Sequence, residues 1–564
     1  MMLLLVGLAL LLSGCSSQNL LKNGDYESMD GWHCYGFHCE LTNIRHTGNH
    51  ALKVSGRTQY WQGPGQDLPY LDPKKTYKIS SYVKMLNDIP GEMGQYIELE
   101  VAITFTDNSK TYMSLASYPR ISSKDGFVLV ESIFNVPKKA IKTANLYYQG
   151  PKAGIEYIVD TASIVPIQLD TNWRKESDNY IESHRKSDIH FKVTSDAGID
   201  KSQVNIQITQ KKKAFPFGTA INMGLYNHGN SKYRDFIHQH FNWGVLENAL
   251  KWDLIEPKQG AADYATPINT IKTLRNHGIK MRAHNIVWAK GQYVPTWVRT
   301  MSGSTLRQTV HQRFINIVSK TKGLVEHWDV NNENLHGFWF QDKLNDPNFS
   351  HQMFTWAHQV DPNVKLFLND YGVVAQASST APYLEQALEF KKANVHLYGL
   401  GVQCHFVENV APNPTVLKEN LNTLAKAGLP IWVTELDVGT HDENLRADWY
   451  ETILRVMYGH PSVEGVIFWG FWDQAHWRKD RGALVVGNDV TLTAAGRRVL
   501  DLFENQWMTK ESRKLSTAGN QFTVRGFHGD YEVKVTYKSH LISDQTKTFT
   551  LDKTSKTINI HVHQ

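Results

Sequence analysis

Two glutamates stand out because each lies in or directly after an apolar run typical of a strand. Glu333 falls in the segment Trp328–Asn334 and Glu435 in the segment Ile431–Val438. Strand interiors rarely hold a carboxylate, because burying an unpaired charge is costly or forces protonation. Two such exceptions, each at the end of a strand, predict a pair of catalytic acids.

A neutral carboxylic acid beside an ionised carboxylate can cleave a glycosidic bond, because one protonates the leaving oxygen while the other attacks the sugar carbon. A separation of about 5 to 5.5 Å would retain the anomeric configuration. The competing interpretation is that each glutamate only closes a structural ion pair near a loop. Two glutamates in matching strand contexts favour the catalytic interpretation.

The region that must position these acids, residues 214–508, alternates between helix and strand patterns. Thr266 reads as a helix N-cap followed by a proline, Gly278 ends that helix, and a strand is predicted at 279–287. About eight such units predict a (β/α)8 barrel, in which chemistry sits at the carboxyl ends of the strands. A Rossmann-type open sheet is disfavoured, because no Gly-x-Gly-x-x-Gly follows an early strand.

Regions of β character flank the barrel. Residues 19–168 contain short strands with turn signals, such as Tyr96–Phe105 with its alternating apolar positions, and predict a β-sandwich of jelly-roll type. Residues 169–213 are interpreted as a connector. Residues 509–564 predict a small C-terminal β domain, because Asp530–Tyr537 alternates between polar and apolar residues.

Composition narrows the possible partners. The chain has 564 residues, of which 41% are hydrophobic and 20% charged, as in ordinary globular proteins. The formal net charge of +5 and the lack of a sustained basic stripe argue against nucleic acid. The 16 Trp and 24 Tyr suit the flat faces of sugars, although large cores also consume them. We expect a monomer.

The first residues predict export. The apolar run is too short to span a bilayer, so residues 1–17 are interpreted as a cleaved signal peptide of a secreted, extracellular protein. The alternative is a bacterial lipoprotein anchored through Cys15. In an oxidising compartment Cys34 and Cys39 could close a small loop, which leaves Cys404 unpaired and buried. The histidines and cysteines form no metal-binding pattern, and no cofactor is expected for catalysis.

Residues 215–507 resemble the catalytic domain of glycoside hydrolase family 10, whose best-known members are endo-1,4-β-xylanases. The matching segments occur in the family's order and are Phe241–Trp252, Ala283–Trp288, Trp328–Glu333, Asn369–Tyr371, Gly401–His405, Thr434–Asp437 and Phe468–Arg478.

The resemblance implies a role for each matching residue. Glu333 would be the proton donor and Glu435 the nucleophile, with His405 orienting Glu435 and Gln403 lining its surroundings. Asn332 would hold the sugar's 2-hydroxyl. The other residues implied to bind sugar are Glu247, Asn248, Lys251, His284, Trp288, Trp469 and Trp477. For the tryptophans core packing is the alternative role, and for the histidines it is a structural one.

The sequence departs from the family pattern at three positions. Ala289 stands where the family usually has a second histidine, Asn334 replaces a small residue, and Trp472 stands where a smaller residue is common. These changes could reshape the floor of the sugar cleft, while the residues implied in hydrolysis are all present.

Residues 19–168 resemble a carbohydrate-binding module of the family 4, 9 and 22 type. The resemblance makes Trp61 and Tyr148 candidates for stacking on sugars and Arg57 a polar partner, with core packing as the alternative for the aromatics. It also implies a structural calcium with Asp160 as a ligand, although Thr161 replaces a frequent second acid.

The leading hypothesis is a secreted retaining endo-β-1,4-xylanase that binds and cleaves polysaccharide. The second hypothesis is a β-1,4-glucanase with the same mechanism. A non-catalytic polysaccharide-binding protein on a barrel scaffold is the third hypothesis.

Overall fold

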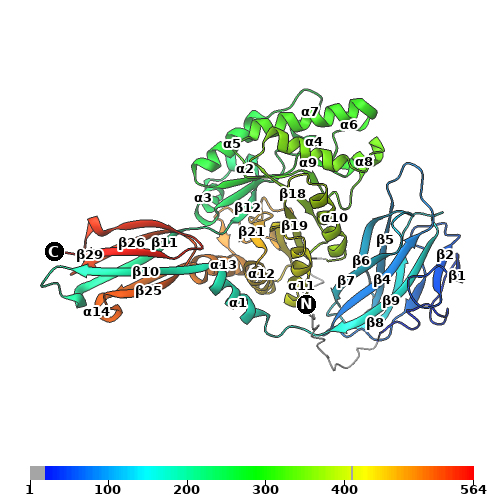
Figure 1. The fold of residues 1–564 in the computed structure, drawn as a ribbon, viewed down its shortest axis with the longest axis horizontal. Coiled ribbons are helices and arrows are strands. Elements are labelled where there is room, and N and C mark those ends of the chain that lie inside the picture. The colour runs from blue at the N-terminus through cyan, green and yellow to red at the C-terminus, as the bar shows by residue number, and fades with distance from the viewer. Residues whose placement is uncertain (1–18, 376, 408–410, 564) are drawn as a thin grey trace, which may run out of the picture. The chain divides into compact units, whose positions relative to one another are not determined.

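The computed structural model describes residues 19–375, 377–407 and 411–563 (Figure 1). The chain divides into two compact units, the first made mainly of residues up to Leu169 and the second running from Asp170 to the C-terminus. The predicted signal peptide, residues 1–17, and Cys15 lie outside the described residues. Among the helices of the described ranges, none is long and apolar enough to cross a membrane.

The N-terminal unit contains two antiparallel sheets. One sheet has the order β1 (His38–Thr42), β2 (Ala51–Ser55), β9 (Tyr157–Ile167), β4 (Thr76–Met85) and β7 (Val128–Asn135). The other has the order β3 (Gly65–Asp67), β8 (Ile141–Gln149), β5 (Gln95–Phe105) and β6 (Lys110–Ile121). The sheets face each other, since the Tyr148 hydroxyl on β8 lies 2.6 Å from Ser81 Oγ on β4. The expected sandwich is therefore present.

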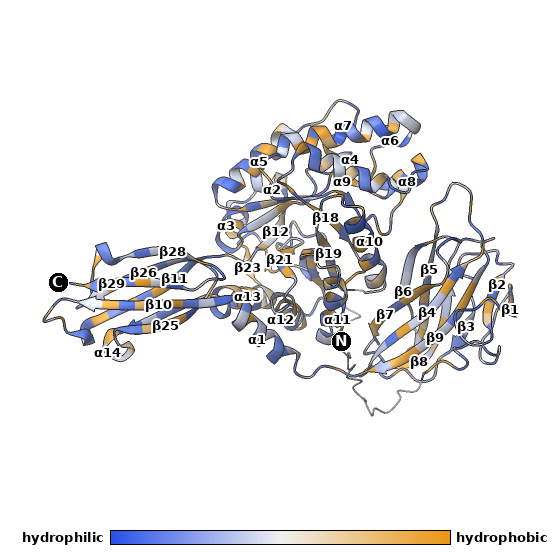
Figure 2. Cartoon of the chain, in the orientation of Figure 1, coloured by the Kyte–Doolittle hydropathy of each residue, from blue (hydrophilic) through white to orange (hydrophobic). Residues whose placement is uncertain are grey.

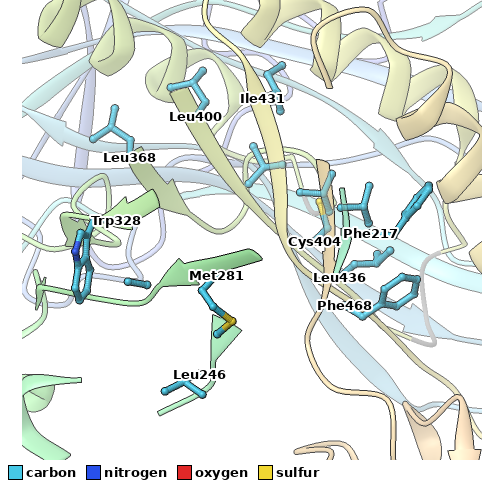
Figure 3. Close-up of a cluster of buried hydrophobic side chains, with 14 of the residues drawn as sticks. Phe217, Leu246, Met281, Trp328, Leu368, Leu400, Cys404, Ile431, Leu436 and Phe468 are labelled. Atoms are coloured by element: carbon cyan, nitrogen blue, oxygen red, sulfur yellow. The ribbon is translucent and has the colours of Figure 1, made fainter. Parts of the chain in front are cut away.

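Within the described residues of the second unit, eight parallel strands close into a barrel, as predicted. These strands are β12 (Phe217–Ile221), β13 (Trp243–Leu246), β14 (Lys280–Ala283), β16 (His327–Asp329), β18 (Lys365–Asp370), β19 (Leu397–Val407), β20 (Ile431–Gly439) and β21 (Val463–Phe468). Every strand supplies buried side chains to one apolar cluster, such as Phe217, Met281, Cys404 and Phe468 (Figure 3). Cys404 is unpaired and buried, as expected.

Helices follow the barrel strands along the chain. The longer ones are α3 (Ser231–His240), α5 (Ala265–Asn276), α7 (Gly303–Thr321), α9 (Phe349–Val360), α10 (Thr380–Lys392), α11 (Pro414–Ala425), α12 (Glu443–Tyr458) and, after the last strand, α13 (Ala494–Asp501). The shorter ones are α2 (Met223–His228), α4 (Trp252–Ile255), α6 (Thr296–Arg299) and α8 (Trp339–Leu344). In α11 the Asn413 side chain caps the first turn and Leu417, Leu421 and Leu424 are buried.

Two local predictions in the barrel differ from the structure. The cap expected at Thr266 is supplied by Asp263, whose carboxylate accepts the backbone N–H groups of Ala265 and Thr266. The strand expected over 279–287 ends at Ala283, and only β15 (Val287–Trp288) follows. The chain leaves the barrel wall there because β15 pairs with β17 (Asn331–Asn332), outside the barrel.

The connector predicted for residues 169–213 is wrong in its second half. Helix α1 (Trp173–His184) is present, but the strands that follow pair with the C-terminal strands in two packed sheets. These sheets are β25 (Gln521–Phe527), β10 (Lys186–Ser195) and β29 (Lys556–Val562), and β24 (Lys510–Lys514), β11 (Val204–Lys213), β26 (Gly529–Tyr537), β27 (His540–Leu541) and β28 (Lys547–Leu551). Apolar and polar residues alternate along these strands (Figure 2). The segment before the barrel and the segment after it therefore build one domain.

Candidate active site

The barrel residues singled out by sequence lie at or just beyond the carboxyl ends of the strands. Glu247 follows β13, His284 follows β14, and Trp469 follows β21. Glu435 lies within β20, and Gln403 lies on β19 as its register partner. Because all barrel strands run parallel, their carboxyl ends meet on one face, where side chains from distant segments can act together.

Glu435 is a buried carboxylate held by two donors. Its side chain is 7% exposed. One oxygen accepts a hydrogen bond from Asn369 Nδ2 at 3.0 Å, and the other lies 3.2 Å from His405 Nε2. Burial acts to raise the pKa of Glu435, but the His405 hydrogen bond, nearby His284 and Asn369 together lower it below its ordinary value. Glu435 is therefore ionised at neutral pH, as a nucleophile must be.

His405 is in turn fixed by Asp437. His405 Nδ1 lies 2.9 Å from Asp437 Oδ2. Burial acts to lower the pKa of His405, but the Asp437 and Glu435 carboxylates raise it to about 10. Asp437 is fully buried and also accepts Trp477 Nε1 at 2.6 Å and Arg478 Nε at 2.8 Å. A protonated His405 can thus stand between two carboxylates with both ring nitrogens donating.

Glu333 is presented by an unusual backbone rather than by a regular strand. It directly follows the short strand β17 and has φ +57°, a left-handed conformation that non-glycine residues adopt at a cost and often at functional sites. Its N–H donates to Asn369 O at 2.9 Å. Its side chain is 10% exposed, accepts from Gln403 Nε2 at 3.3 Å and pairs with Lys290 Nζ at 2.9 Å.

Two shared amides bring the candidate acids together. Asn369 Nδ2 donates both to Glu435 and, at 2.9 Å, to Asn332 Oδ1, the side chain next to Glu333. Gln403 reaches Glu333 from the position beside Glu435. The two carboxyls therefore lie at one site, although they come from segments far apart in the sequence.

A second group of predicted residues lies beside Glu435. Lys251 Nζ bonds Asn248 Oδ1 at 2.7 Å and lies 5.1 Å from the centre of the Trp288 ring. Burial lowers the pKa of Lys251, and the Glu435 and Glu247 carboxylates oppose that shift. Burial raises the pKa of Glu247. These donors and acceptors are the groups that could bind sugar hydroxyls.

The tryptophans differ in exposure. Trp288 stacks on Tyr293 at 3.7 Å, and Trp469 meets the His284 ring edge-on at 5.3 Å, both partly buried. Trp477 is 55% exposed beside His405 and is the ring most open to a ligand.

A buried network of ion pairs inside the barrel joins Arg282, Asp329 and His284. Arg282 is hydrogen bonded to Asp329, whose second oxygen lies 2.9 Å from His284 Nδ1. All three side chains are buried. Removing one partner of such a buried network typically costs about 3–5 kcal/mol, because the remaining charge is left uncompensated.

Several residues that hold the site had no predicted role. Asn369, Asp437, Asp329 and Arg478 lie inside the segments that match the family, and each is a polar or charged residue close to a strand end. Arg282 lies outside those segments, and only its contact with Asp329 on the neighbouring strand shows its role.

The three departures from the family pattern have different surroundings. Ala289 is buried and its carbonyl accepts Trp339 N–H at 3.0 Å. Trp472 is buried in the apolar cluster and donates to Gly487 O at 2.9 Å. Asn334 is buried, and neither atom of its amide has a protein partner.

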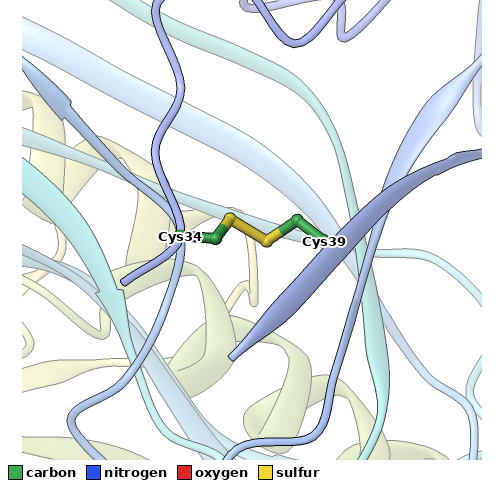
Figure 4. Close-up of a disulfide and its surroundings, with 2 residues drawn as sticks. All are labelled: Cys34 and Cys39. Atoms are coloured by element: carbon green, nitrogen blue, oxygen red, sulfur yellow. A yellow bond between two sulfur atoms is a disulfide. The ribbon is translucent and has the colours of Figure 1, made fainter. Parts of the chain in front are cut away.

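The N-terminal unit has a pocket of about 540 Å³ on the sheet that contains β3, β8 and β5. Trp61 lines it and is 53% exposed, which suits stacking on a sugar. The other aromatic lining residues are Tyr35, Phe37, Tyr60, Tyr112 and Tyr147. A disulfide between Cys34 and Cys39 closes the loop that carries Tyr35 and Phe37 (Figure 4).

Tyr148 and Arg57 are wrongly predicted as sugar-binding residues. Tyr148 is fully buried and its hydroxyl lies 2.9 Å from that of Tyr26. Tyr147, not Tyr148, faces the pocket, because successive side chains of a strand point to opposite faces. Arg57 is buried, and its guanidinium donates to backbone carbonyls such as Pro151 O at 2.7 Å.

Asp160 does not fit a calcium site in this arrangement. One carboxylate oxygen accepts the N–H groups of His46 and Thr47 at 2.7 and 3.0 Å, and the other accepts the N–H of Thr161. A calcium ligand must offer oxygen lone pairs to the ion, whereas these are occupied by donors. Among the described residues, no three His, Cys, Asp or Glu side chains gather as a metal site.

Fold and site together define a (β/α)8 barrel with two buried glutamates at the carboxyl ends of its strands. Residues 206–502 match Glycosyl hydrolase family 10, and residues 18–154 match a carbohydrate binding domain family. The chain belongs to glycosyl hydrolase family 10.

Relatives with curated names include Endo-1,4-beta-xylanase 1 of Arabidopsis thaliana, 32% identical over 90% of this chain and 52% of the relative. The Anti-sigma-I factor RsgI6 of Acetivibrio thermocellus is 36% identical over 68% of this chain and 49% of that protein. The chain thus spans about half the length of these relatives. Among solved structures, xylanase 10B from Thermotoga petrophila RKU-1 in complex with xylobiose is 24% identical, with a TM-score of 0.48 over 52% of this chain and 94% of that one.

Proposed function

We propose that the protein is a secreted retaining glycoside hydrolase that cleaves internal β-1,4 linkages of xylan. The observation that carries this proposal is the shared site of Glu333 and Glu435, in which Asn369 and His405 lower the pKa of Glu435 against the effect of burial. A buried anion poised in this way is a nucleophile, and a second carboxyl beside it can deliver a proton.

The mechanism has two steps. In the first, Glu435 attacks the anomeric carbon while Glu333 gives its proton to the departing glycosidic oxygen, which leaves a glycosyl ester on Glu435. In the second, Glu333 removes a proton from water, which attacks the same carbon and releases Glu435. Asn332 has an unpartnered buried Nδ2 beside Glu333, and we assign it to the sugar's 2-hydroxyl.

Xylan is proposed because the chain belongs to a family in which several relatives carry the name endo-1,4-β-xylanase. A β-1,4-glucanase with the same mechanism is the second candidate. Binding of polysaccharide without cleavage, on a barrel kept as a scaffold, is the third candidate. Secretion through residues 1–17, the alternative anchor at Cys15 and a monomeric state stay predictions.

The test is release of reducing ends from xylan, cellulose and mixed-linkage glucan by the full chain. We expect release from xylan well above that from either glucan, with the new reducing end first formed as the β-anomer by NMR. Greater release from glucan would favour the second candidate. Binding to xylan without release from any of the three would favour the third.

We also propose that the N-terminal pocket holds polysaccharide by stacking on Trp61. Replacing Trp61 with alanine is expected to weaken binding of the full chain to insoluble xylan about 10-fold or more, because an aromatic contact and its buried area are lost. The measurement is depletion of protein from solution. Tyr70→Ala is the matched control, because Tyr70 is 71% exposed and does not line the pocket. Equal weakening by both variants would place the binding elsewhere.

A further inference from the structure

Lys290 lies against Glu333, the candidate proton donor. Its Nζ forms an ion pair with Glu333 Oε2 at 2.9 Å. The same Nζ bonds the Tyr371 hydroxyl at 3.0 Å and lies 4.4 Å from the centre of that ring. One ammonium therefore connects the carboxyl to an aromatic side chain from the end of another barrel strand.

The backbone around Lys290 is fixed in place. The preceding residue, Ala289, donates its N–H to Asn332 O at 2.9 Å, directly beside Glu333. The ring of Tyr371 stacks on His336 at 4.2 Å, and His336 Nδ1 lies 2.7 Å from buried Asp370. Both the lysine and its aromatic support are therefore held by partners outside the ion pair.

We propose that Lys290 is a positioning residue that aims the Glu333 carboxyl and holds a positive charge against it, with Tyr371 holding the ammonium in place. This inference rests on the proposed hydrolase function. It assigns to one cation the electrostatic support of the Glu333 carboxylate.

Lys290 forms a direct ion pair with Glu333. Lys251 and the Glu435 carboxylate belong to the same site, and Lys251 also interacts electrostatically with Glu333. Gln403 is neutral, and Tyr371 contacts Lys290 through its hydroxyl. Burial acts to lower the pKa of Lys290, but Glu333 and Tyr371 raise it above its ordinary value, so the ammonium stays charged through the working range.

The sign of the effect follows from electrostatics. A positive charge at 2.9 Å favours the ionised carboxylate, which is the form needed to accept a proton from water in the second step. The first step needs the protonated form. Removing the positive charge of Lys290 from this contact is therefore expected to move the alkaline limb of kcat/KM to higher pH.

The experiment measures pH profiles of kcat/KM for a β-xylobioside whose leaving group needs protonation. In Lys290→Met we expect the alkaline limb to move up by about 1–2 pH units. Lys290→Arg, which keeps the charge, should restore most of the wild-type profile. Tyr371→Phe should move the limb in the same direction by less, because it removes one contact of the ammonium and keeps the ring.

The matched control is Lys320→Met, since Lys320 is an exposed lysine near another tyrosine ring, on the outer helix α7. Its profile should match wild type. An unshifted limb in folded Lys290→Met, with only a uniform loss of rate, would overturn the proposal. If the wild-type protein cleaves no xyloside, the proposed function fails instead, so the two failures are distinguishable.

Discussion

Glu435→Gln is expected to lower kcat on xylan by about 10⁴-fold or more, because no covalent intermediate can form without the carboxylate nucleophile. The glutamine is nearly isosteric and can still contact Asn369 and His405, so the fold should be retained. The measurement is reducing-end release from soluble xylan, with thermal unfolding of the same samples.

Glu464→Gln is the matched control for that variant. Glu464 lies near the start of β21, the strand beside β20, and is exposed at the opposite end of the barrel. The Glu464→Gln variant should cleave xylan at the wild-type rate. Full activity in Glu435→Gln, or an equal loss in both variants, would rule out Glu435 as the nucleophile.

Glu333→Ala is expected to lose about 10²- to 10⁴-fold on xylan but far less on an aryl xyloside with a good leaving group. The reason is that a sugar leaving group needs a proton, whereas a strongly acidic phenol departs without one. Because the second step then lacks its base, an added small anion such as azide should speed turnover and yield a β-xylosyl azide.

Glu326→Gln serves as the control for Glu333→Ala. Glu326 directly precedes β16 at the other end of the barrel and pairs with Arg275 at 3.0 Å. That pair is partly exposed, so its loss should cost little stability. A Glu333→Ala variant that loses equal activity on both substrates, with no response to azide, would show that Glu333 does not transfer the proton.

Much of the fold could be predicted because it depends on local periodicity. The apolar face of α11, with Leu417, Leu421 and Leu424, recurs at helical spacing, and Gly428 ends the segment with φ +65°. The alternation in β5 likewise reflects burial on one face of a strand. The two glutamates were found by the same logic, since a carboxylate in an apolar strand demands a reason.

Contacts between distant segments could not be predicted in this way. Residues 186–213 were interpreted as a connector although β10 and β11 alternate between apolar and polar residues. The sequence does not show that C-terminal segments pair with these two strands. Tyr147 and Tyr148 are adjacent and chemically alike, and only the facing of β8 decides which one reaches the pocket.

What the sequence alone determined is therefore the set of elements, the barrel, and the chemical character of its strand ends. Tertiary structure decided which charges share a site. It pairs Lys290 with Glu333 and brings Asp437 within hydrogen-bonding distance of His405. Hydrophobic periodicity depends on residues that are close in the sequence, so it can be read without the structure. The pKa of a buried charged group depends on opposite charges from distant segments, which only the closed barrel brings within hydrogen-bonding distance.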